Sequence, residues 1–217
     1  MGTLSGGPRL LHGALVAFRL PDPTPKVIAF QFNPTTLQRS LTAKTTGSEG
    51  APGEALRLSG PPEEKIKVDI ALDAVDQLEA GSKTAAESGI HPQLALLELL
   101  LYPSTATVIA NTALLFVGTI EVVPMEAPLI LFIWGKNRIA PVRITSFSVS
   151  EEEYDANLNP IRANISLELQ VLSYDDLSRL NPGHYVFMAH HMNKEVLSRV
   201  GQARGLDAVL GGDVSLL

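Results

Sequence analysis

The stretch from Arg162 to Leu172 alternates strictly between apolar and polar residues, and it limits the fold more than any other part of the chain. Its apolar positions are Ile165, Leu167, Leu169 and Val171, and its polar positions are Asn164, Ser166, Glu168 and Gln170. Alternation with a period of two places the two sets on opposite faces of an extended backbone. The pattern therefore predicts a long β-strand with one buried and one solvated face.

A second alternating stretch, Val142 to Val149, precedes it. Taken as a regular strand, it places Val142, Ile144, Ser146 and Ser148 on one side and Arg143, Thr145, Phe147 and Val149 on the other. The segment between the two stretches, Ser150 to Pro160, is acidic and rich in turn-forming residues. We therefore expect a long hairpin from Val142 to Leu172.

Four further segments have strand patterns. Ala14 to Leu20 and Lys26 to Phe32 are short β-prone runs, and the prolines at 21, 23 and 25 predict a stiff turn between them. Lys65 to Leu72 alternates like the hairpin strands. Leu129 to Trp134 is almost wholly apolar, which is typical of a central strand.

Two helices are expected. The first begins near Pro92, repeats leucines at helical spacing and should end at Pro103, where a proline cannot continue the hydrogen-bond ladder. Leu96 and Leu99 widen its apolar surface, so we expect the sheet to cover it. The second helix is expected from Tyr185 to Arg204, with loose residues after it.

These patterns predict a chain that is mainly β with α: a β sandwich or barrel with one packed helix and a C-terminal helical tail. The β domain should span residues 1–173, with a mobile Gly- and Pro-rich loop at about 47–62 and an apolar insertion at about 104–128. Residues 174–217 should form the helical extension.

Composition argues against several classes of protein. Among 217 residues, 45% are hydrophobic and 18% charged, which is a globular mixture. The net charge is −6, with no cluster of Lys and Arg that could neutralise phosphates, so nucleic acid is not an expected partner. Cysteine is absent, which excludes disulfides and thiolate metal sites.

Membrane insertion and secretion are not expected either. The most apolar stretch, Ala106 to Ile120, is shorter than the roughly 20 residues of a spanning helix, so it should be buried or lie in an interface. The N-terminal residues lack the basic, apolar and small-residue order of a signal peptide.

No motif for catalysis, cofactor or metal binding is visible. The adjacent His190 and His191 point about 100° apart on a helix and cannot share a metal. The acidic groups Glu63-Glu64, Glu151-Glu152-Glu153 and Asp175-Asp176 are expected in solvated turns or strand flanks. Asp73 follows a strand end without a visible basic companion. We therefore expect no enzyme, although an active site assembled from distant residues would leave no local motif.

Two stretches remain distinctive. The first is Phe30-Gln31-Phe32-Asn33-Pro34, in which Phe30 and Phe32 should share a strand face before a turn. The second includes Trp134-Gly135, a large ring expected to anchor the core beside a turn glycine. It closes with Tyr154 and with Asn159-Pro160-Ile161-Arg162, where Arg162 could pair with an acidic residue of the turn or of a neighbouring subunit.

In this order the two stretches resemble the tube-type proteins of contractile, phage-tail-like injection systems, over the range from Ala14 to Leu172. The greatest similarity is to the tube initiators or baseplate-hub adaptors. The resemblance implies that Phe30, Phe32, Asn33, Pro34, Trp134, Gly135, Tyr154, Asn159, Pro160 and Arg162 belong to structural or assembly motifs. It also implies a ring of six subunits whose sheets join into a barrel around a lumen, with hairpins that contact the next ring. The hairpin Val142 to Leu172 would line the lumen with its polar face.

The same resemblance implies particular partners and a location. These partners are an inner tube protein, a spike or hub protein, and baseplate or sheath-initiator components. Assembly would take place in the cytoplasm, within a particle that can be released. One feature departs from the family: hub adaptors often carry a C-terminal LysM domain, whereas the residues from Tyr174 onward lack its Gly-Asp-Thr-Leu start and predict a helix.

Three alternatives stay open at this point. A tube terminator or cap would share the same motifs. A ligand- or carbohydrate-binding β module would need a concave site with aromatic walls, for which one Trp and four Tyr are few. A cell-wall hydrolase would need a paired acid and base that the sequence does not display.

Overall fold

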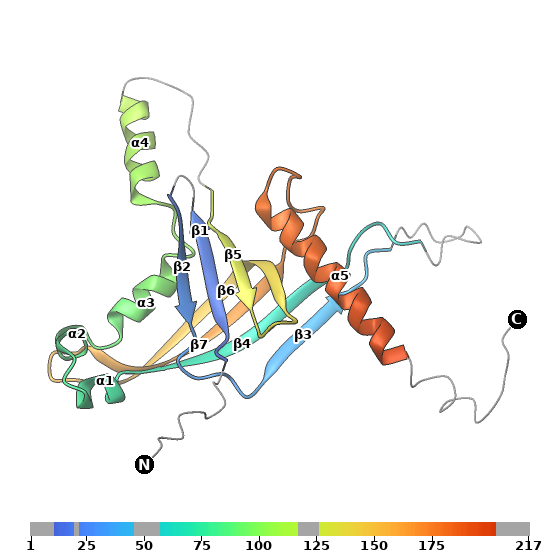
Figure 1. Ribbon diagram of the computed structural model, residues 1–217. Helices are drawn as coiled ribbons and strands as arrows, with labels where there is room; N and C mark the ends of the chain where they lie inside the picture. The colour runs from blue at the N-terminus through green and yellow to red at the C-terminus, as the bar shows by residue number, and fades with distance from the viewer. Residues whose placement is uncertain (1–10, 20–21, 46–56, 117–125, 203–217) are drawn as a thin grey trace, which may run out of the picture.

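The chain folds around one seven-stranded antiparallel sheet (Figure 1). The computed structural model describes residues 11–19, 22–45, 57–116 and 126–202. The strands are β1 (Ala14–Arg19), β2 (Asp22–Ala29), β3 (Leu37–Thr42), β4 (Glu63–Asp73), β5 (Leu129–Ile133), β6 (Ile139–Tyr154) and β7 (Pro160–Val171). Their order across the sheet is β2-β1-β5-β6-β7-β4-β3. The predicted class, mainly β with α, is confirmed.

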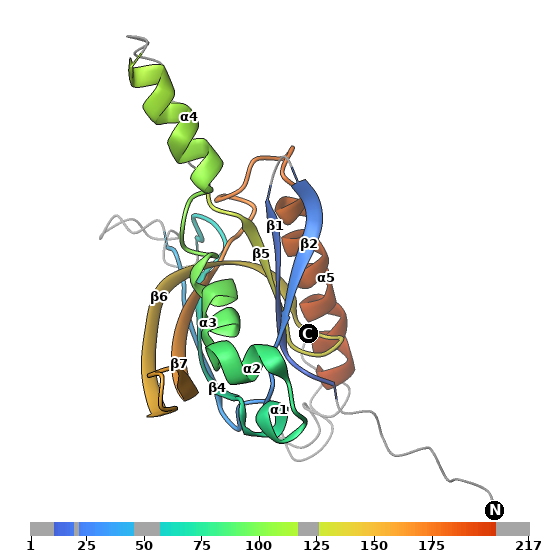
Figure 2. The same cartoon turned by 90° about the vertical axis from the view of Figure 1, so that its left-hand side faces the viewer.

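The described residues also form five helices. They are α1 (Val75–Glu79), α2 (Lys83–Ser88), α3 (His91–Glu98), α4 (Thr105–Phe116) and α5 (Pro182–Gln202). In Figure 2, α3 lies between the β1–β2 hairpin and the β6–β7 hairpin, and α4 extends away from the sheet. Helix α5 lies on the other side of β1 and β5, so helices flank the sheet on both sides (Figure 1).

Strand β6 joins the two halves of the sheet. Its first residues, up to Val142, pair with β5, and the remainder pairs with β7 as far as Tyr154. Because one continuous strand belongs to both halves, the sheet curves around a single core (Figure 2). That core combines the inner faces of β1 and β4 to β7 with Leu94, Leu97 and Leu100 of the α3 region.

The predicted alternation holds in β4 and β7. In β4 the buried side chains are Glu64, Ile66, Val68, Ile70 and Leu72. In β7 Ile165, Leu167, Leu169 and Val171 are buried, whereas Asn164 and Glu168 are exposed. The two strands pair directly over nine residues, from Lys65–Gln170 to Asp73–Arg162, with their apolar faces in register.

The predicted alternation fails in β6, because the register with β7 shifts between Ile144 and Ser146. Thr145 is the extra residue of this bulge. After it, Phe147 is opposite Leu167 and Val149 is opposite Ile165, so both apolar side chains return to the inner face. A regular strand would have placed them outside with Arg143, and the bulge is what keeps the apolar face continuous.

Two turns also differ from expectation. Pro23 and Pro25 lie within β2 rather than in the turn before it. β2 is an edge strand, and prolines are tolerated there because the missing N–H can face away from the sheet. The hairpin turn is limited to residues 155–159, because residues 150–154, including the three glutamates, continue β6.

The helices show the largest differences. Helix α3 ends at Glu98, five residues before Pro103, and Leu96 and Leu99 are exposed rather than covered by the sheet. Helices α1 and α2 were not expected. The C-terminal helix is confirmed, beginning at Pro182. The predicted insertion contains α4, which is mostly exposed, so the expected burial is wrong and the expected interface stays a prediction. Most of the loop predicted at 47–62 and the end of the chain lie outside the described residues.

Candidate assembly surfaces

The outer face of the β6–β7 hairpin is polar and hydrogen-bonded across the strands. Arg143 donates to the Gln170 Oε1 atom at 2.6 Å, and Asn164 donates to the Glu152 Oε1 atom at 2.9 Å. The Thr145 hydroxyl donates to the Glu168 carbonyl at 3.1 Å. These bonds hold side chains of the exposed face in place, so the hairpin presents an ordered hydrophilic surface.

The tip of this hairpin is organised by Asp155. Its Oδ1 atom accepts from the backbone N–H groups of Asn157 and Asn159, at 2.7 and 2.8 Å. The Asn159 side chain donates to Asp155 Oδ2 and to the Glu87 carbonyl. Hydrogen bonds from Asn159 are the main reason why the pKa of Asp155 lies below its ordinary value. Asn159 thus fastens the turn to the end of α2.

Pro160 and Leu158 complete that attachment. The Pro160 carbonyl accepts from the Ile90 N–H at 3.0 Å, next to the start of α3. Leu158 has a φ of 64°, a left-handed conformation that ordinary residues adopt rarely, and its side chain is exposed. The tip is consequently a fixed shape rather than a free loop end.

Arg162 joins the last part of β6 to the last part of β4. Its guanidinium contacts the Asp73 Oδ2 atom and the Glu153 Oε1 atom, each at 2.8 Å. The hydrogen bond with Asp73 is the largest cause of the raised pKa of Arg162. The pairing is therefore made within the chain, and Asp73 has the basic companion that its sequence neighbourhood did not reveal.

Asp73 also connects the two distinctive stretches of the sequence. The Gln31 side chain donates to the Asp73 carbonyl at 2.7 Å and accepts from its N–H at 3.0 Å. Asp73 is thus in contact with both Gln31 of the first stretch and Arg162 of the second. Residues that are far apart in sequence meet at the end of β4.

The first stretch follows β2 instead of lying in it. Phe30 is buried, but Phe32 is 48% exposed, so the two rings do not share a buried face as expected. The Asn33 side chain accepts from the Gly13 N–H and donates to the Leu11 carbonyl, both at 2.8 Å. Pro34 is half-buried in the connection to β3. Asn33 therefore ties this connection to the residues just before β1.

Trp134 packs at the end of β5. Its ring stacks on Phe132 with centroids 6.0 Å apart and is tilted against Phe30 at 6.4 Å. A Cβ atom at Gly13 would lie 2.7 Å from the ring, so only glycine allows this approach. Gly135 follows with a φ of 68°, which begins the turn to β6. By contrast, Tyr154 is exposed, and its hydroxyl contacts Glu151 at 3.4 Å.

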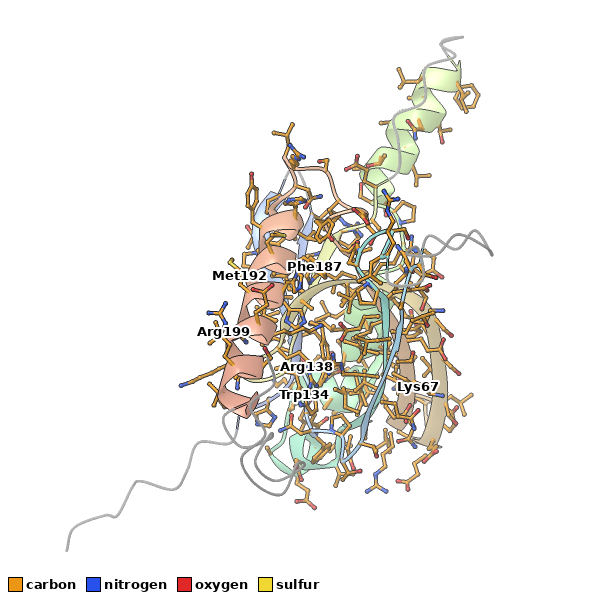
Figure 3. All side chains as sticks on the ribbon, turned by 90° about the vertical axis from the view of Figure 1, so that its right-hand side faces the viewer. Lys67, Trp134, Arg138, Phe187, Met192 and Arg199 are labelled. Carbon is orange, nitrogen blue, oxygen red and sulfur yellow. The ribbon has the colours of Figure 1, made fainter. Side chains whose placement is uncertain are left out.

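A cluster of charged side chains under α5 was not expected. Glu64 accepts from Arg39 Nε at 2.8 Å and from Lys194 Nζ at 2.7 Å. Arg138 and His190 lie close enough to interact electrostatically with these groups. We call Arg39, Glu64, Arg138, His190 and Lys194 the Glu64 cluster. Figure 3 shows Arg138 between α5 and the strands.

The predicted solvated position of Glu64 is wrong, since only 4% of the residue is exposed. Its place in the sequence gave a sign of this: Glu64 shares the side of β4 that buries Ile66 and Val68. Burial by itself would raise its pKa, but the hydrogen bonds from Lys194 and Arg39 outweigh burial and lower it. Glu64 is thus an ionised anchor that fastens α5 to β3 and β4.

His190 lies near Glu64 and Lys194 and is 6% exposed. Neither of its ring nitrogens has a hydrogen-bond partner in the part of the chain that the structure describes. Burial, followed by the charge of Lys194, lowers its pKa to about 4. The ring is therefore neutral near pH 7. No group of three or more His, Asp or Glu residues able to hold a metal occurs among the described residues.

Helices α4 and α5 both carry exposed apolar side chains. On α4 these are Val108, Ile109, Leu115 and Phe116, and on α5 they are Tyr185, Met188, Met192, Val196, Leu197 and Val200. Phe116 is 87% exposed. Within the described residues, no helix combines the length and hydropathy required to cross a membrane. Such exposed apolar surface is typical of contact sites for other proteins.

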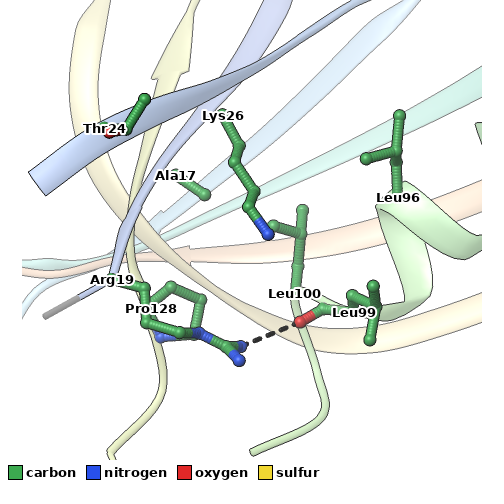
Figure 4. Close-up of a pocket in the computed structure, with 8 residues that line it drawn as sticks. All are labelled: Ala17, Arg19, Thr24, Lys26, Leu96, Leu99, Leu100 and Pro128. Atoms are coloured by element: carbon green, nitrogen blue, oxygen red, sulfur yellow. Dashed lines mark hydrogen bonds between the residues drawn. The ribbon is translucent and has the colours of Figure 1, made fainter. Parts of the chain in front are cut away.

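A small cavity of about 100 Å³ lies between α3 and the β1–β2 hairpin (Figure 4). Its walls are mostly aliphatic, with Arg19, Thr24 and Lys26 as the polar residues, and they contain no aromatic ring and no carboxylate. Arg19 donates to the carbonyls of Leu99 and Tyr102, at 3.0 and 2.7 Å, and so holds the end of α3.

The sequence model of the family described as contractile injection system tube protein matches residues 17–178, about three quarters of the chain. This chain belongs to the contractile injection system tube protein family. A search of the curated proteins finds no match. The family match extends from β1 through β7 and stops before α5, so the helix fastened by Glu64 follows the matched region. The resemblance to the tube family is confirmed, and with it a structural role in a contractile injection system.

Proposed function

We propose that this chain is a non-catalytic tube initiator or hub adaptor that forms a ring of six and joins the inner tube to the spike or baseplate hub. The observation that carries the proposal is the open sheet of a tube-family protein. Strands β2 and β3 form its two ends, so each end leaves backbone groups of one edge free.

Strand β3 is the better candidate for pairing with a neighbouring subunit. All its residues except the half-buried Leu37 are exposed, although the Arg39 side chain is partly covered, and Leu41 is 51% exposed. A largely exposed edge strand of this kind favours strand addition from another chain. If each β3 pairs with the opposite edge of the next copy, the sheets close into a barrel, and no edge remains free.

The β6–β7 hairpin would line that barrel. Its outward face carries the ordered polar residues described above, and its inner face belongs to the core. A hydrated lumen requires this division, because a channel wall must be wetted on one side and packed on the other.

The additional helices would supply contacts to other components of the particle. Helix α4 has no charged residue and extends from the sheet, and α5 lies beyond the family match with its own exposed apolar side chains. The expected partners are the inner tube protein, the spike or hub, and baseplate or sheath-initiator components. Assembly is proposed to occur in the cytoplasm, without nucleic acid as a ligand.

The binding-module alternative finds less support. It requires a concave site with aromatic walls. The cavity beside α3 and two larger ones, of about 350 and 280 Å³, have no aromatic residue in their walls. A tube terminator or cap differs from an initiator only in its position in the particle.

The experiment is a gentle pull-down of the tagged chain from its native host, imaged by electron microscopy. Sheathed particles with the tag at the junction of tube and baseplate would support the initiator or adaptor. A tag at the distal end of the tube would indicate a terminator. A small protein that purifies without any particle, even with its neighbours expressed, would contradict the proposal.

A further inference from the structure

We propose that the Glu64 cluster receives the acidic tip of the β6–β7 hairpin from a second copy of this chain, so that copies associate head to tail. The inference rests on the proposed function in one respect: copies of the chain must lie next to one another in the particle.

The first argument is the charge of the cluster. Three cationic side chains, those of Arg39, Arg138 and Lys194, gather around a single carboxylate. Arg39 and Lys194 occupy both oxygens of that carboxylate. No carboxylate of the described residues lies within salt-bridge distance of Arg138. The positive charge of Arg39 is close enough to repel that of Arg138. The cluster is therefore two positive charges in excess, in a chain of net charge −6.

The second argument is access. The side chains of Arg39 and Lys194 are 27% and 38% exposed, although the Glu64 side chain between them is nearly buried. An incoming carboxylate could thus reach the cations at the surface of the cluster without displacing Glu64. Partly desolvated charges of this kind interact more strongly than fully exposed ones.

The third argument is the complementary charge of the hairpin tip. Glu151, Glu152, Glu153 and Asp155 lie there, and Arg162 is already paired with Asp73 and Glu153. Glu151 and Glu152 are exposed, and their hydrogen bonds come from neutral groups, Tyr154 and Asn164. The tip therefore keeps at least two carboxylates available for an external cation.

The geometry prevents the two sites from meeting within one chain. The β4–β7 ladder begins at Lys65–Gln170, next to the cluster, and ends at Asp73–Arg162, next to the tip. Eight steps of about 3.3 Å separate them by roughly 26 Å. The tip can consequently reach only the cluster of another copy. Because the two surfaces differ, the contact is heterologous, the kind that generates rings or open stacks.

Disulfide trapping tests this contact directly, because the natural chain contains no cysteine. Asn137→Cys places a thiol in the β5–β6 turn beside the cluster, and Asn157→Cys places one in the tip. Both positions are exposed, and both substitutions leave every charge in place. Particles assembled from a mixture of the two single variants should form a disulfide dimer on mild oxidation. The matched control pairs Asn137→Cys with Ser148→Cys, an exposed position in the middle of the hairpin, and should give little dimer.

Charge exchange then tests the cause. Glu151→Lys with Glu152→Lys should lower the yield of trapped dimer roughly fivefold or more, as should Arg138→Glu. Combining Arg138→Glu with the two tip changes should restore part of the yield, since the new carboxylate at position 138 can pair with a lysine of the tip although the cluster as a whole then has no net charge.

Three outcomes would overturn the inference. Rings or particles that form without a trapped dimer would refute this contact and leave the proposed function intact. A trapped dimer whose yield stays the same after the charge substitutions would refute the electrostatic basis of the contact. Trapping of the cluster thiol to another protein of the particle would show a different occupant. If no particle contains the chain at all, the proposed function fails as well, and the electron micrographs distinguish that case.

Discussion

Trp134 brings together residues from three separate parts of the chain: Gly13, Phe30 and Phe132. Trp134→Ala would leave a cavity between them, and we expect it to lower the free energy of unfolding by about 3–5 kcal/mol. Urea denaturation of the purified chain measures this loss, and incorporation into particles should fail with it. Trp134→Phe keeps a ring against Phe132 and should cost less. An alanine variant that assembles normally but loses a ligand would support the binding-module alternative instead.

His190 makes the stability depend on pH. Its pKa is lowered from 6.5 to about 4 in the folded chain, so between these values the unfolded chain binds more protons. Stability should therefore be complete above pH 6.5 and decrease as the pH falls toward 4, by about 3 kcal/mol. Glu64 acts in the same direction at lower pH, because its pKa is also lowered and its ion pairs are lost on protonation.

Unfolding measured at several values between pH 7 and pH 4 tests this prediction. His190→Phe should flatten the dependence above pH 4.5, whereas the substitution His91→Gln, at an exposed position, should leave it as it is in the natural chain. An unchanged slope in His190→Phe would show that other groups cause the loss.

The sequence revealed the individual motif residues but not their contacts. Arg162 and Trp134 stand out by type and position, and their expected local neighbours, an acidic residue of the hairpin and the turn glycine, are present. The link through Asp73 and the Glu64 cluster could not be foreseen, because each joins segments that come together only when the sheet closes. The only sign that Glu64 is buried was its place two residues before Ile66, on the same face of the predicted strand.

At the level of elements, the bulge in β6 decides which side chains reach the core. Deleting Thr145 would remove the extra residue, and Phe147 and Val149 would then face solvent or force the hairpin out of register. We expect the deletion variant to aggregate or to lose most of its cooperative unfolding in a thermal melt. Thr145→Ala retains the extra residue and should change the stability by less than about 1 kcal/mol. A deletion variant as stable as the natural chain would mean that the bulge can move along the strand.

The elements that were predicted well are those with an unbroken period. Strands β4 and β7 alternate along almost their whole length, so their faces could be assigned from sequence. Helices α1 and α2 have only five and six residues, too few to display a helical period. For α3, Leu96 and Leu99 widened the apolar surface and predicted good cover by the sheet, yet the buried residues of the helix are only Leu94 and Leu97.

Exposed apolar side chains on α4 can be tested separately from folding. Ile109 is 63% exposed, so Ile109→Asp should change the free energy of unfolding of the isolated chain by about 0.5 kcal/mol or less. If α4 contacts a neighbouring protein, the same variant should be absent from purified particles. Thr105→Ser, at the exposed start of the helix, provides the control and should be incorporated normally. Normal incorporation of Ile109→Asp would remove α4 from the assembly surfaces.

For the whole molecule, the decisive question is whether the free edge of β3 pairs with another copy. Neighbouring N–H groups of a strand point to opposite sides, so one of Ser40 and Leu41 donates toward β4 and the other toward the free edge. Ser40→Pro and Leu41→Pro each remove one of these donors. The variant that loses the ladder bond should unfold at lower urea concentration. The other should keep nearly natural stability as a monomer and yet fail to form rings in electron micrographs. Ser40→Ala and Leu41→Ala keep both N–H groups, so they separate the loss of a donor from the loss of a side chain. Every subunit of the ring carries the substitution, so the β3 edge is weakened at every interface. Even partial loss of pairing should therefore abolish closed rings. Closed rings from both proline variants would show that subunits join through side chains alone, and the barrel across subunits would have to be abandoned.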